Sequence, residues 1–499
     1  MKYSSKEVVP FGGVMAMLVG AAVLLAGGSS AQASPIWEYG GAPSSEMPFS
    51  ARLHASGAEA SYFNPAHLVD AGQGRVTFGT SVSAGRLRIE MDERPAGVDI
   101  SDAIYDARIS DAQGRRSPPQ TRPLATDELP RQRGGHDPSF EQPYLTLGTA
   151  IPIVDERFTI GAYATVPADR FAHQQPHFVD EREQYFSNSL HFERFGDRMV
   201  GASFALAMGL RVTDWLRVGA GLTMAQDAAS DNVVFSPDPI DQERSEVTTA
   251  VTIRTRAVPH LGLSAKPAQG WTVAATVHAP FQNRVDGENE LRFWNFSPTP
   301  DADGAVRQQV TYVYDYEPLR VGAGLSRQWG DDDRGALLGG QLLYGRWSRY
   351  VDRQGQQWPE QWRDTLSPTL AGGWWNQTHR LHGELRFMPS AVEPQTGRTN
   401  FVDNSQWASS VGWSRQVELL SLPFRVGVQG QAHWLVGQRT VKEKDSSDPV
   451  IDEFPESFHV QSEETIEESL DFRTNNPGYP GYRTSGLAVG AGLFLESTF

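Results

Sequence analysis

The chain has 499 residues, with 44 Lys and Arg against 60 Asp and Glu, a formal net charge of −16, and no cysteine. The missing thiols exclude a disulfide framework, a Cys-ligated metal and a thiol nucleophile. The acidic balance argues against nucleic acid, whose phosphates require clustered cations. A mean hydropathy of −0.42 and the lack of an apolar run of about 18 residues beyond the N-terminus exclude a polytopic helical membrane protein.

The N-terminus has the three parts of an export signal. Lys2 and Lys6 form a basic start, Val14–Ala26 is an apolar stretch, and Ala31-Gln32-Ala33 supplies the small residues of a cleavage site. We therefore expect residues 1–33 to be a signal peptide that is cleaved after Ala33. A retained helical anchor is the alternative, but the apolar centre is too short to span a bilayer.

Residues 34–73 do not alternate in polarity, and they contain the stretch Ala58–Ala66 with the sequence AEASYFNPA. The side-chain amide of Asn64 is suited to hold a turn, and Pro65 fixes its own φ, so the pair predicts a rigid turn. The simpler interpretation is an ordinary turn that leads into a first strand at Arg75–Ser83.

From residue 74 onward the chain alternates with a period of two. In Arg217–Ala225, for example, Val218, Ala220, Leu222 and Met224 are apolar, whereas the residues between them are small or polar. The same pattern recurs in Phe158–Val166, Val200–Val212, Val273–Ala279, Val321–Leu325 and Phe424–Trp434. Alternating segments of about ten residues are typical of a transmembrane β-barrel with lipid outside and a polar lumen. A soluble β-sandwich also alternates, but here the non-apolar face is rich in glycine, which favours an open lumen.

The C-terminal segment favours the barrel over the sandwich. Counting back from Phe499, every second residue through Leu487 is apolar except Ser497. A final strand with a terminal aromatic resembles the assembly signal of bacterial outer-membrane barrels. We therefore predict an all-β fold, a transmembrane antiparallel β-barrel over residues 74–499, with Phe499 as its assembly signal.

Several motifs resemble those of the FadL/TodX-type outer-membrane transporters of long-chain fatty acids and hydrophobic compounds. The stretch Asn64-Pro65-Ala66 resembles the hatch motif of that family, although His67 stands where the family usually has glycine. Three further stretches resemble parts of the same family. Residues 258–273 resemble its central hairpin, residues 344–365 its Trp-Ser strand and the return that follows it, and residues 386–404 its late hairpin. Two long polar inserts, near Glu90–Pro138 and Asn283–Gln309, exceed the common pattern.

The resemblance implies a barrel of about 14 strands whose lumen is plugged by an N-terminal hatch at residues 34–73. It implies passive uptake of hydrophobic molecules across the outer membrane, gated at Phe63, Asn64, Pro65 and Ala66. The implied partners are a fatty acid or hydrocarbon ligand, outer-membrane lipid and the barrel-assembly machinery. The chain is expected to be a monomer without a cofactor. Replacing Asn64 by alanine is expected to leave the barrel folded and to alter uptake.

The sequence offers no catalytic or metal site, so we expect the protein not to be an enzyme. No Gly-x-Ser-x-Gly, His-Glu-x-x-His or phosphate-loop motif occurs. His173 and His177 have a ligand-like spacing, but their Gln- and Pro-containing segment is interpreted as a loop. Asp301–Gly304 and Asp331–Asp333 could offer oxygen ligands to calcium, but the first lacks the later Glu of the twelve-residue calcium loop and the second is interpreted as an exposed turn.

Two other functions remain open at this stage: a general diffusion porin with an open lumen, and a lipid-modifying barrel enzyme. The use of the tryptophans is also open. They gather at positions 347, 358, 362, 374, 375, 407 and 413. Such residues would form an aromatic girdle at the membrane interface or line an apolar binding site.

Overall fold

The structure is a computed structural model. It describes residues 35–93, 95, 139–169, 190–199, 201–236, 246–293, 305–331, 333–352, 355–419, 422–443, 449–450, 474, 476 and 478–499. The predicted signal peptide, His173, His177 and Asp301–Gly304 lie outside these residues. Within the described ranges, no helix is both long enough and apolar enough to cross a membrane.

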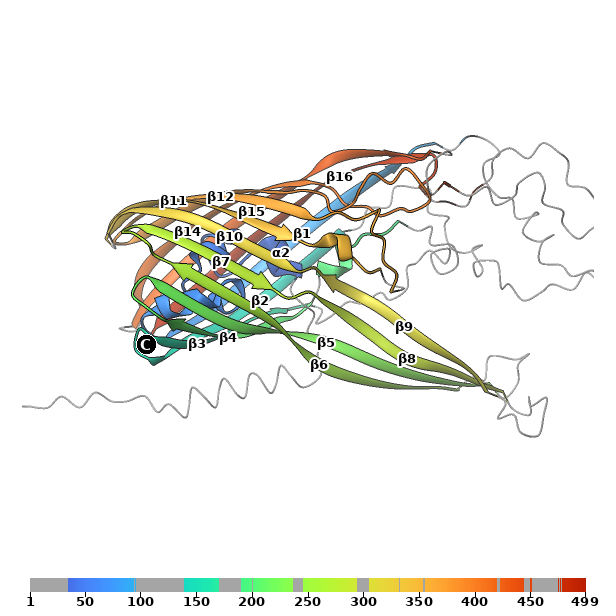
Figure 1. The fold of residues 1–499 in the computed structure, drawn as a ribbon, viewed down its shortest axis with the longest axis horizontal. Helices are drawn as coiled ribbons and strands as arrows, with labels where there is room; N and C mark the ends of the chain where they lie inside the picture. The colour runs from blue at the N-terminus through green and yellow to red at the C-terminus, as the bar shows by residue number, and fades with distance from the viewer. Residues whose placement is uncertain are drawn as a thin grey trace, which may run out of the picture.

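Sixteen strands make up one sheet in the described part of the chain, and fourteen of them close into a ring (Figure 1). Each ring strand pairs antiparallel with both neighbours, and β1 pairs with β16 from Arg75↔Thr498 to Met91↔Tyr482. The predicted fold class, a closed antiparallel barrel of about 14 strands, is confirmed. The ring strands are β1 Arg75–Met91, β2 Ser139–Val154, β3 Phe158–Pro167, β4 Ser203–Arg211, β5 Leu216–Ser236, β6 Glu246–Ala265, β7 Trp271–His278, β10 Arg320–Gly330, β11 Arg334–Gly345, β12 Thr365–Asn376, β13 His379–Met388, β14 Gln406–Leu419, β15 Leu422–Val441 and β16 Gly481–Thr498.

The two ends of the barrel differ in their connections. At one end, short turns such as Asp155–Arg157 join consecutive strands, and β1 begins and β16 ends there. We call this the short-turn end. At the other, long-loop end, the connections are long. Outer-membrane barrels place short turns on the periplasmic side and long loops outside the cell.

The predicted alternation of polarity matches the two faces of the wall. In β3, Thr159, Gly161, Tyr163 and Thr165 are buried toward the lumen, whereas the residues between them are, with one exception, partly exposed. Large apolar side chains cover the outside, with exposed fractions of 62% for Leu370, 60% for Val411 and 58% for Leu261. Because successive strand residues point to opposite faces, every second residue meets the surroundings of the barrel. Such an apolar exterior is what a bilayer-spanning barrel requires.

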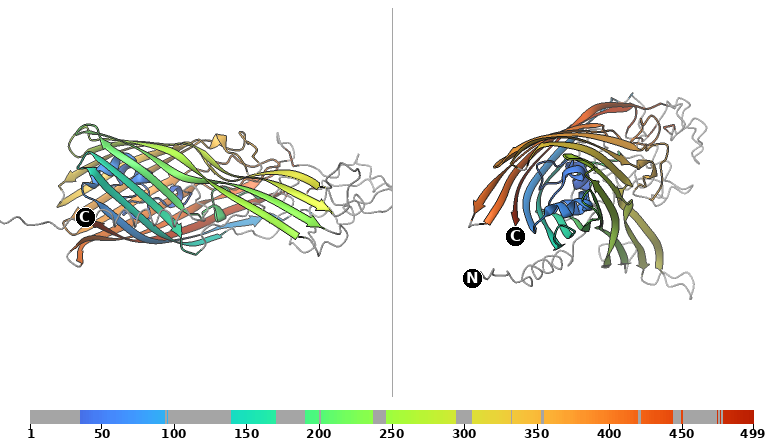
Figure 2. Two further views of the ribbon diagram at one scale, coloured as in Figure 1. Left: turned by 90° about the horizontal axis from the view of Figure 1, so that it is seen from below. Right: turned by 60° about the vertical axis from the view of Figure 1, so that its left-hand side comes forward.

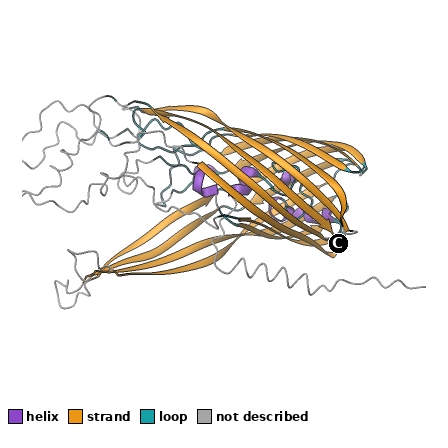
Figure 3. Ribbon diagram, turned by 180° about the vertical axis from the view of Figure 1, so that it is seen from behind, coloured by secondary structure: helices purple, strands orange, loops and turns teal. Residues whose placement is uncertain are grey.

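The second polar insert forms a regular hairpin instead of a loop. Strands β8 Phe281–Phe293 and β9 Ala305–Glu317 pair antiparallel with each other. Strand β8 also pairs parallel with β5 over Ala228–Ser236, the part of β5 that extends beyond its pairing with β4. Strands β5, β6, β8 and β9 therefore leave the ring together as a four-stranded extension at the long-loop end (Figures 1 and 3).

Residues 35–71 fold into short helices inside the barrel (Figure 2). These are α2 Pro35–Gly40, α3 Ala51–His54, α4 Ala60–Phe63 and the 3-10 helix η1 Pro65–Ala71. Their side chains form the largest buried cluster of the molecule together with inward residues of the wall. The lumen is therefore filled by residues 35–71, which we call the hatch, and the chain then enters β1 directly.

Candidate functional site

Asn64 holds the turn at the centre of the hatch. Its Oδ1 accepts a hydrogen bond from the Ala66 backbone N at 3.2 Å, which caps η1, and Pro65 occupies the first turn of that helix. A proline is suited to this position because it has no N–H to leave unpaired. The Asn64 Nδ2 donates to the carbonyl of Arg52 at 3.0 Å and to that of Leu263 in β6 at 3.4 Å. Asn64 thus ties two parts of the hatch to the wall.

Three glycines on adjacent wall strands form the seat for this turn. In the register of the sheet, Gly209 of β4 lies opposite Gly219 of β5, and Gly219 lies opposite Gly262 of β6. A Cβ at Gly219 would lie 2.3 Å from the Pro65 carbonyl carbon, and one at Gly262 would lie 2.1 Å from the Asn64 Oδ1. No side chain fits at these distances, so the row allows the backbone of the hatch to approach the wall.

His67 does not disturb the hatch motif. Glu156 is the one non-glycine residue with a positive φ among those described, so His67 has an ordinary backbone conformation within η1. Its Nδ1 lies 3.3 Å from the Asp70 Oδ2, and the Asp70 Oδ1 lies 3.0 Å from the Nε of Arg217 and 3.4 Å from the Nζ of Lys266. This group fastens the last turn of the hatch to the short-turn end of β5 and to the β6–β7 turn.

Ion pairs hold the first helix of the hatch. The Glu38 carboxylate in α2 pairs with Arg52 at 2.6 Å and with Arg320 of β10 at 3.3 Å, and Tyr62 donates a hydrogen bond to it. Burial alone raises the pKa of Glu38, but the guanidiniums of Arg320 and Arg52 outweigh this effect and hold the pKa well below its usual range. Glu38 therefore stays charged. The guanidinium of Arg386 also donates to the α2 carbonyls of Glu38 and Tyr39.

A buried carboxylate clamps the middle of the hatch. Glu384 of β13 accepts hydrogen bonds from the backbone N of Phe49 at 2.9 Å and from the backbone N of Ser50 at 2.8 Å. Farther along, Arg425 of β15 lies 3.2 Å from the Glu46 carboxylate. Removing one partner of such a buried pair typically costs about 3–5 kcal/mol. The hatch is therefore held by polar contacts on one side of the lumen and by the glycine seat on the other.

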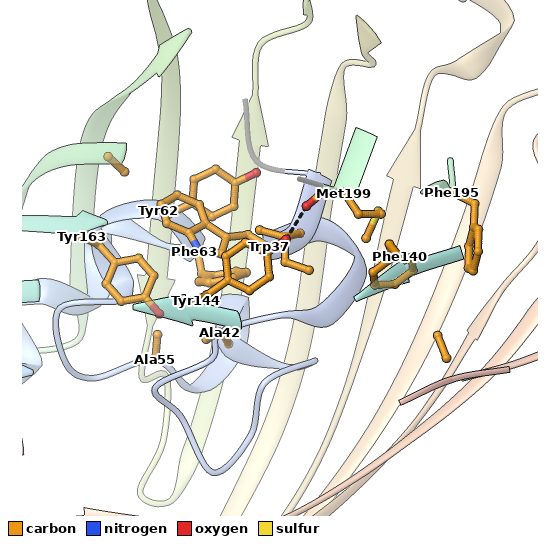
Figure 4. Close-up of a cluster of buried hydrophobic side chains, with 14 of the residues drawn as sticks. Trp37, Ala42, Ala55, Tyr62, Phe63, Phe140, Tyr144, Tyr163, Phe195 and Met199 are labelled. Carbon is orange, nitrogen blue, oxygen red and sulfur yellow. Dashed lines mark hydrogen bonds between the residues drawn. The ribbon is translucent and has the colours of Figure 1, made fainter. Parts of the chain in front are cut away.

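An aromatic group packs between the hatch and the wall (Figure 4). The Trp37 ring lies 4.6 Å from the Tyr62 ring and 5.0 Å from the Tyr163 ring of β3, measured between centroids. Phe63 joins them at 5.0 Å from Tyr62. Near the long-loop end, Tyr144 of β2 donates a hydrogen bond to the Met199 carbonyl, in the 3-10 helix η2 Gly196–Met199. The hatch thus shares one apolar core with the wall and with this inserted segment.

A pocket lies on the long-loop side of the hatch. Its floor includes Glu38 and Tyr39 of α2, and its walls come from the long-loop ends of β9 to β13. The lining is amphipathic, because it combines charged side chains with apolar and aromatic ones. The charged lining residues include Arg320, Arg386, Glu317 and Asp315, and the apolar ones include Tyr316, Trp347, Leu343 and Met388.

The tryptophans fall into two groups, one on the outside of the wall and one buried beside the pocket. Trp374, Trp407 and Trp413 lie on the outside of the wall, with exposed fractions of 45%, 46% and 37%. Trp347 and Trp362 are buried instead and stack on each other at 5.6 Å, beside the pocket. Tyr316, Tyr350, Trp358 and Phe401 complete this inner aromatic cluster, in which Trp347 belongs to η4 Trp347–Arg349.

The structure brings some of the predicted residues together and separates one. Phe63, Asn64, Pro65 and Ala66 form the buried turn on the glycine seat. Phe499 lies far from the pocket, at the short-turn end, where its backbone N donates to the Gly74 carbonyl and 63% of the residue is exposed. Of the pocket lining, sequence reasoning singled out only Trp347, as one of several tryptophans with two possible uses. It missed the charged lining residues, for which the signal was arginine on inward strand positions, such as Arg386.

Asp331 and Asp333 lie in the β10–β11 turn, and the Asp331 carboxylate accepts the backbone N–H groups of Asp333 and Arg334. Across the ranges described above, no group of three or more His, Asp or Glu side chains is arranged to hold a metal ion. The geometry offers a plugged lumen and an amphipathic pocket, and the pocket suits binding of a small molecule.

Fold and site together define a fourteen-stranded β-barrel whose lumen is closed by an N-terminal hatch. No family model and no curated protein sequence matches the chain. Among solved structures, it is similar to a FadL homologue of Pseudomonas aeruginosa, with a TM-score of 0.51 and 15% identity over 95% of this chain and 99% of that one. At this identity the likeness concerns the fold, and the resemblance to FadL/TodX-type transporters is confirmed at that level.

Two toluene transporters give weaker matches. TodX of Pseudomonas putida has a TM-score of 0.45 and 10% identity, covering 90% of this chain and 97% of that one. TbuX of Ralstonia pickettii has a TM-score of 0.40 and 12% identity, covering 94% and 98%.

Proposed function

We propose that the protein is an outer-membrane channel for passive uptake of hydrophobic molecules, exported by a signal peptide at residues 1–33. The observation that carries the proposal is the amphipathic pocket directly on the long-loop side of a hatch that fills the lumen. A ligand that enters from outside would reach this pocket before it meets the hatch. The apolar outside of the wall and the fold shared with a FadL homologue support the same function.

The lining of the pocket favours an amphiphile over a bare hydrocarbon. Arg320 and Arg386 present guanidiniums next to Trp347 and Tyr316. Most of the charged lining is paired within the protein, but the buried Arg386 Nε has no hydrogen-bond partner in the part of the chain that the structure describes, and an unpaired buried polar group costs about 1–3 kcal/mol. The carboxylate of a long-chain fatty acid would accept a hydrogen bond from this atom while the chain meets the apolar lining, whereas toluene has no acceptor for it.

Flux measurements in reconstituted vesicles test the function. We expect the protein to speed entry of a long-chain fatty acid into the vesicle lumen, while its conductance for salt in planar bilayers stays low because the hatch fills the lumen. A large salt conductance would instead support a general diffusion porin. Release of hydrolysed lipid by the purified protein would support a barrel enzyme.

Trp347→Ala tests the ligand site with a matched control. We expect fatty-acid binding to weaken by about 10- to 150-fold, because removing a large apolar side chain from the pocket wall loses about 1.5–3 kcal/mol of apolar burial. Trp407→Ala removes the same side chain from the outside of the wall, where 46% of the residue is exposed, and should leave binding unchanged. Titration with a fluorescent fatty acid gives both affinities. Equal affinities in the two variants would place the ligand elsewhere.

A further inference from the structure

The four-stranded extension continues the lipid-facing surface of the barrel beyond the length needed to cross a bilayer. Strands β5 and β6 contain 21 and 20 residues, whereas a tilted strand crosses the hydrocarbon core in about 9–11 residues. About half of each strand therefore extends past the membrane core at the long-loop end, where β8 and β9 join them.

One face of the extension is continuous with the outside of the wall. The pairing of β5 with β6 has no register break, so side chains keep alternating between the same two faces. On β6, Leu261 faces outward with 58% exposed, and Val251 and Val247 lie on that same face with 60% and 62% exposed. On β5, the outward series that contains Leu222 continues to Asn232. We call this the outer face.

Charge is segregated between the two faces. Among the side chains that are described, the outer face of the extension carries Asn232, Val247, Thr249, Val251, Val285 and Asn289 and no charged group. The opposite face carries Asp231, Arg254, Asp286, Glu288, Glu290 and Arg307. There, Arg307 pairs with Glu290 at 3.3 Å, and Thr311 donates to Asp286 at 2.8 Å.

The polar groups of the outer face bond to one another. The Asn232 Nδ2 donates to the Asn289 Oδ1 at 2.9 Å, and the Thr249 Oγ1 donates to the Asn232 Oδ1 at 2.9 Å. This amide and hydroxyl ladder crosses β6, β5 and β8 between the exposed valines. An uncharged surface that mixes apolar side chains with such groups suits the boundary between lipid headgroups and acyl chains.

The extension also leans away from the barrel, in the direction that brings its outer face toward a lipid surface. Figures 1 and 3 show β5, β6, β8 and β9 diverging from the barrel at the long-loop end. Because the sheet leans away from the barrel axis, its outer face turns down toward the surface in which the barrel sits. The charged face turns up toward water.

We propose that the outer face of the extension rests on the lipid surface of the outer leaflet and acts as a second, interfacial membrane contact beside the barrel. This inference rests on the proposed insertion of the barrel into the outer membrane. The occupant is a lipid surface because the face continues one that already meets lipid and lacks charge. Among the described residues, β9 pairs only with β8, so its other edge has no strand partner. This edge is tolerated at the interface, because water there forms hydrogen bonds with its backbone N–H and C=O groups.

Single-cysteine labelling tests the proposal without background, since the chain has no cysteine. Val251→Cys places a nitroxide on the outer face, and Thr252→Cys places one on the charged face of the same strand. Leu370→Cys, at a position 62% exposed on the barrel outside, is the control for insertion. Each full-length variant is reconstituted in phosphatidylethanolamine–phosphatidylglycerol vesicles. Relaxation of the label by oxygen and by a water-soluble nickel chelate is then compared.

We expect the label at 251 to lose most of its nickel relaxation in vesicles relative to detergent and to gain oxygen relaxation, while the label at 252 stays open to nickel. Equal nickel relaxation at 251 and 252 overturns the proposal, provided that the label at 370 is shielded by lipid. Spin–spin broadening at 251 that grows with protein density would assign the face to a second copy and also overturn it. Exposure of the label at 370 to nickel would instead refute insertion of the barrel itself.

Discussion

Gly219→Val is expected to displace the hatch from its seat while the barrel stays closed. A Cβ at this position would lie 2.3 Å from the Pro65 carbonyl carbon and 2.4 Å from the Ala66 backbone N, so the backbone of the hatch must move. Overpacking of this kind costs about 1–3 kcal/mol, which corresponds to a rise of about 5- to 150-fold in the ratio of open to closed hatch. Single-channel recordings should show a higher salt conductance than the native protein has.

Gly430→Val is the matched control for this change. Gly430 lies in β15, is exposed, and its Cβ would meet no atom within 4 Å. Valine favours strands, so both variants should keep the heat-dependent gel mobility of a folded barrel. A native conductance in Gly219→Val, with the barrel intact, would show that the row of glycines does not seat the hatch.

Asn64→Ala is expected to change ligand flux on the order of tenfold without unfolding the barrel. The substitution removes the cap of η1 and the bonds to the Arg52 and Leu263 carbonyls. Loss of a helix cap costs about 0.5–2 kcal/mol, and a change of 1.4 kcal/mol corresponds to a tenfold change in the population of the open hatch. The measurement is fatty-acid entry into reconstituted vesicles, and we expect faster entry because the closed hatch is weakened.

Asn376→Ala separates this effect from the loss of any asparagine. The Asn376 side chain accepts the backbone N–H groups of Thr378 and His379 in the β12–β13 turn at the short-turn end. It supports a turn without touching the hatch, so flux should be native. If Asn64→Ala also has native flux, Asn64 does not help to hold the hatch closed.

Much of the fold could be predicted because it depends on local alternation. The period of two in Phe158–Val166 and Arg217–Ala225 reports which residues lie on the outside of the wall, whatever the neighbouring strand. The hatch was also accessible to sequence reasoning, because residues 34–73 lack that alternation and Asn64-Pro65-Ala66 resembles the hatch motif of FadL/TodX-type transporters. In contrast, Asn283–Gln309 was interpreted as a polar insert. Its charged residues hid an alternation that becomes visible only once β8 is paired with β5.

The candidate site depended on contacts between distant residues, which one sequence does not encode in a readable way. Glu38 pairs with Arg320 of β10, which lies far away in the sequence, so this pair can be recognised only when the arrangement of the strands between them is known. The register that aligns Gly209, Gly219 and Gly262 is set by the turns between their strands. The same holds for Trp347 and Trp407. They look alike in sequence, and only their position on the wall separates a pocket residue from a lipid-facing one.

The short link between the hatch and the wall limits how the lumen opens. Helix η1 ends at Ala71 and β1 begins at Arg75, and the Arg75 Nε donates to the Ala71 carbonyl at 3.2 Å. Four backbone steps reach at most about 14 Å when fully extended. The end of the hatch at Ala71 therefore stays close to the start of β1, at the short-turn end of the barrel. For the proposed uptake, this means that the hatch moves while its end at Ala71 stays attached to the wall.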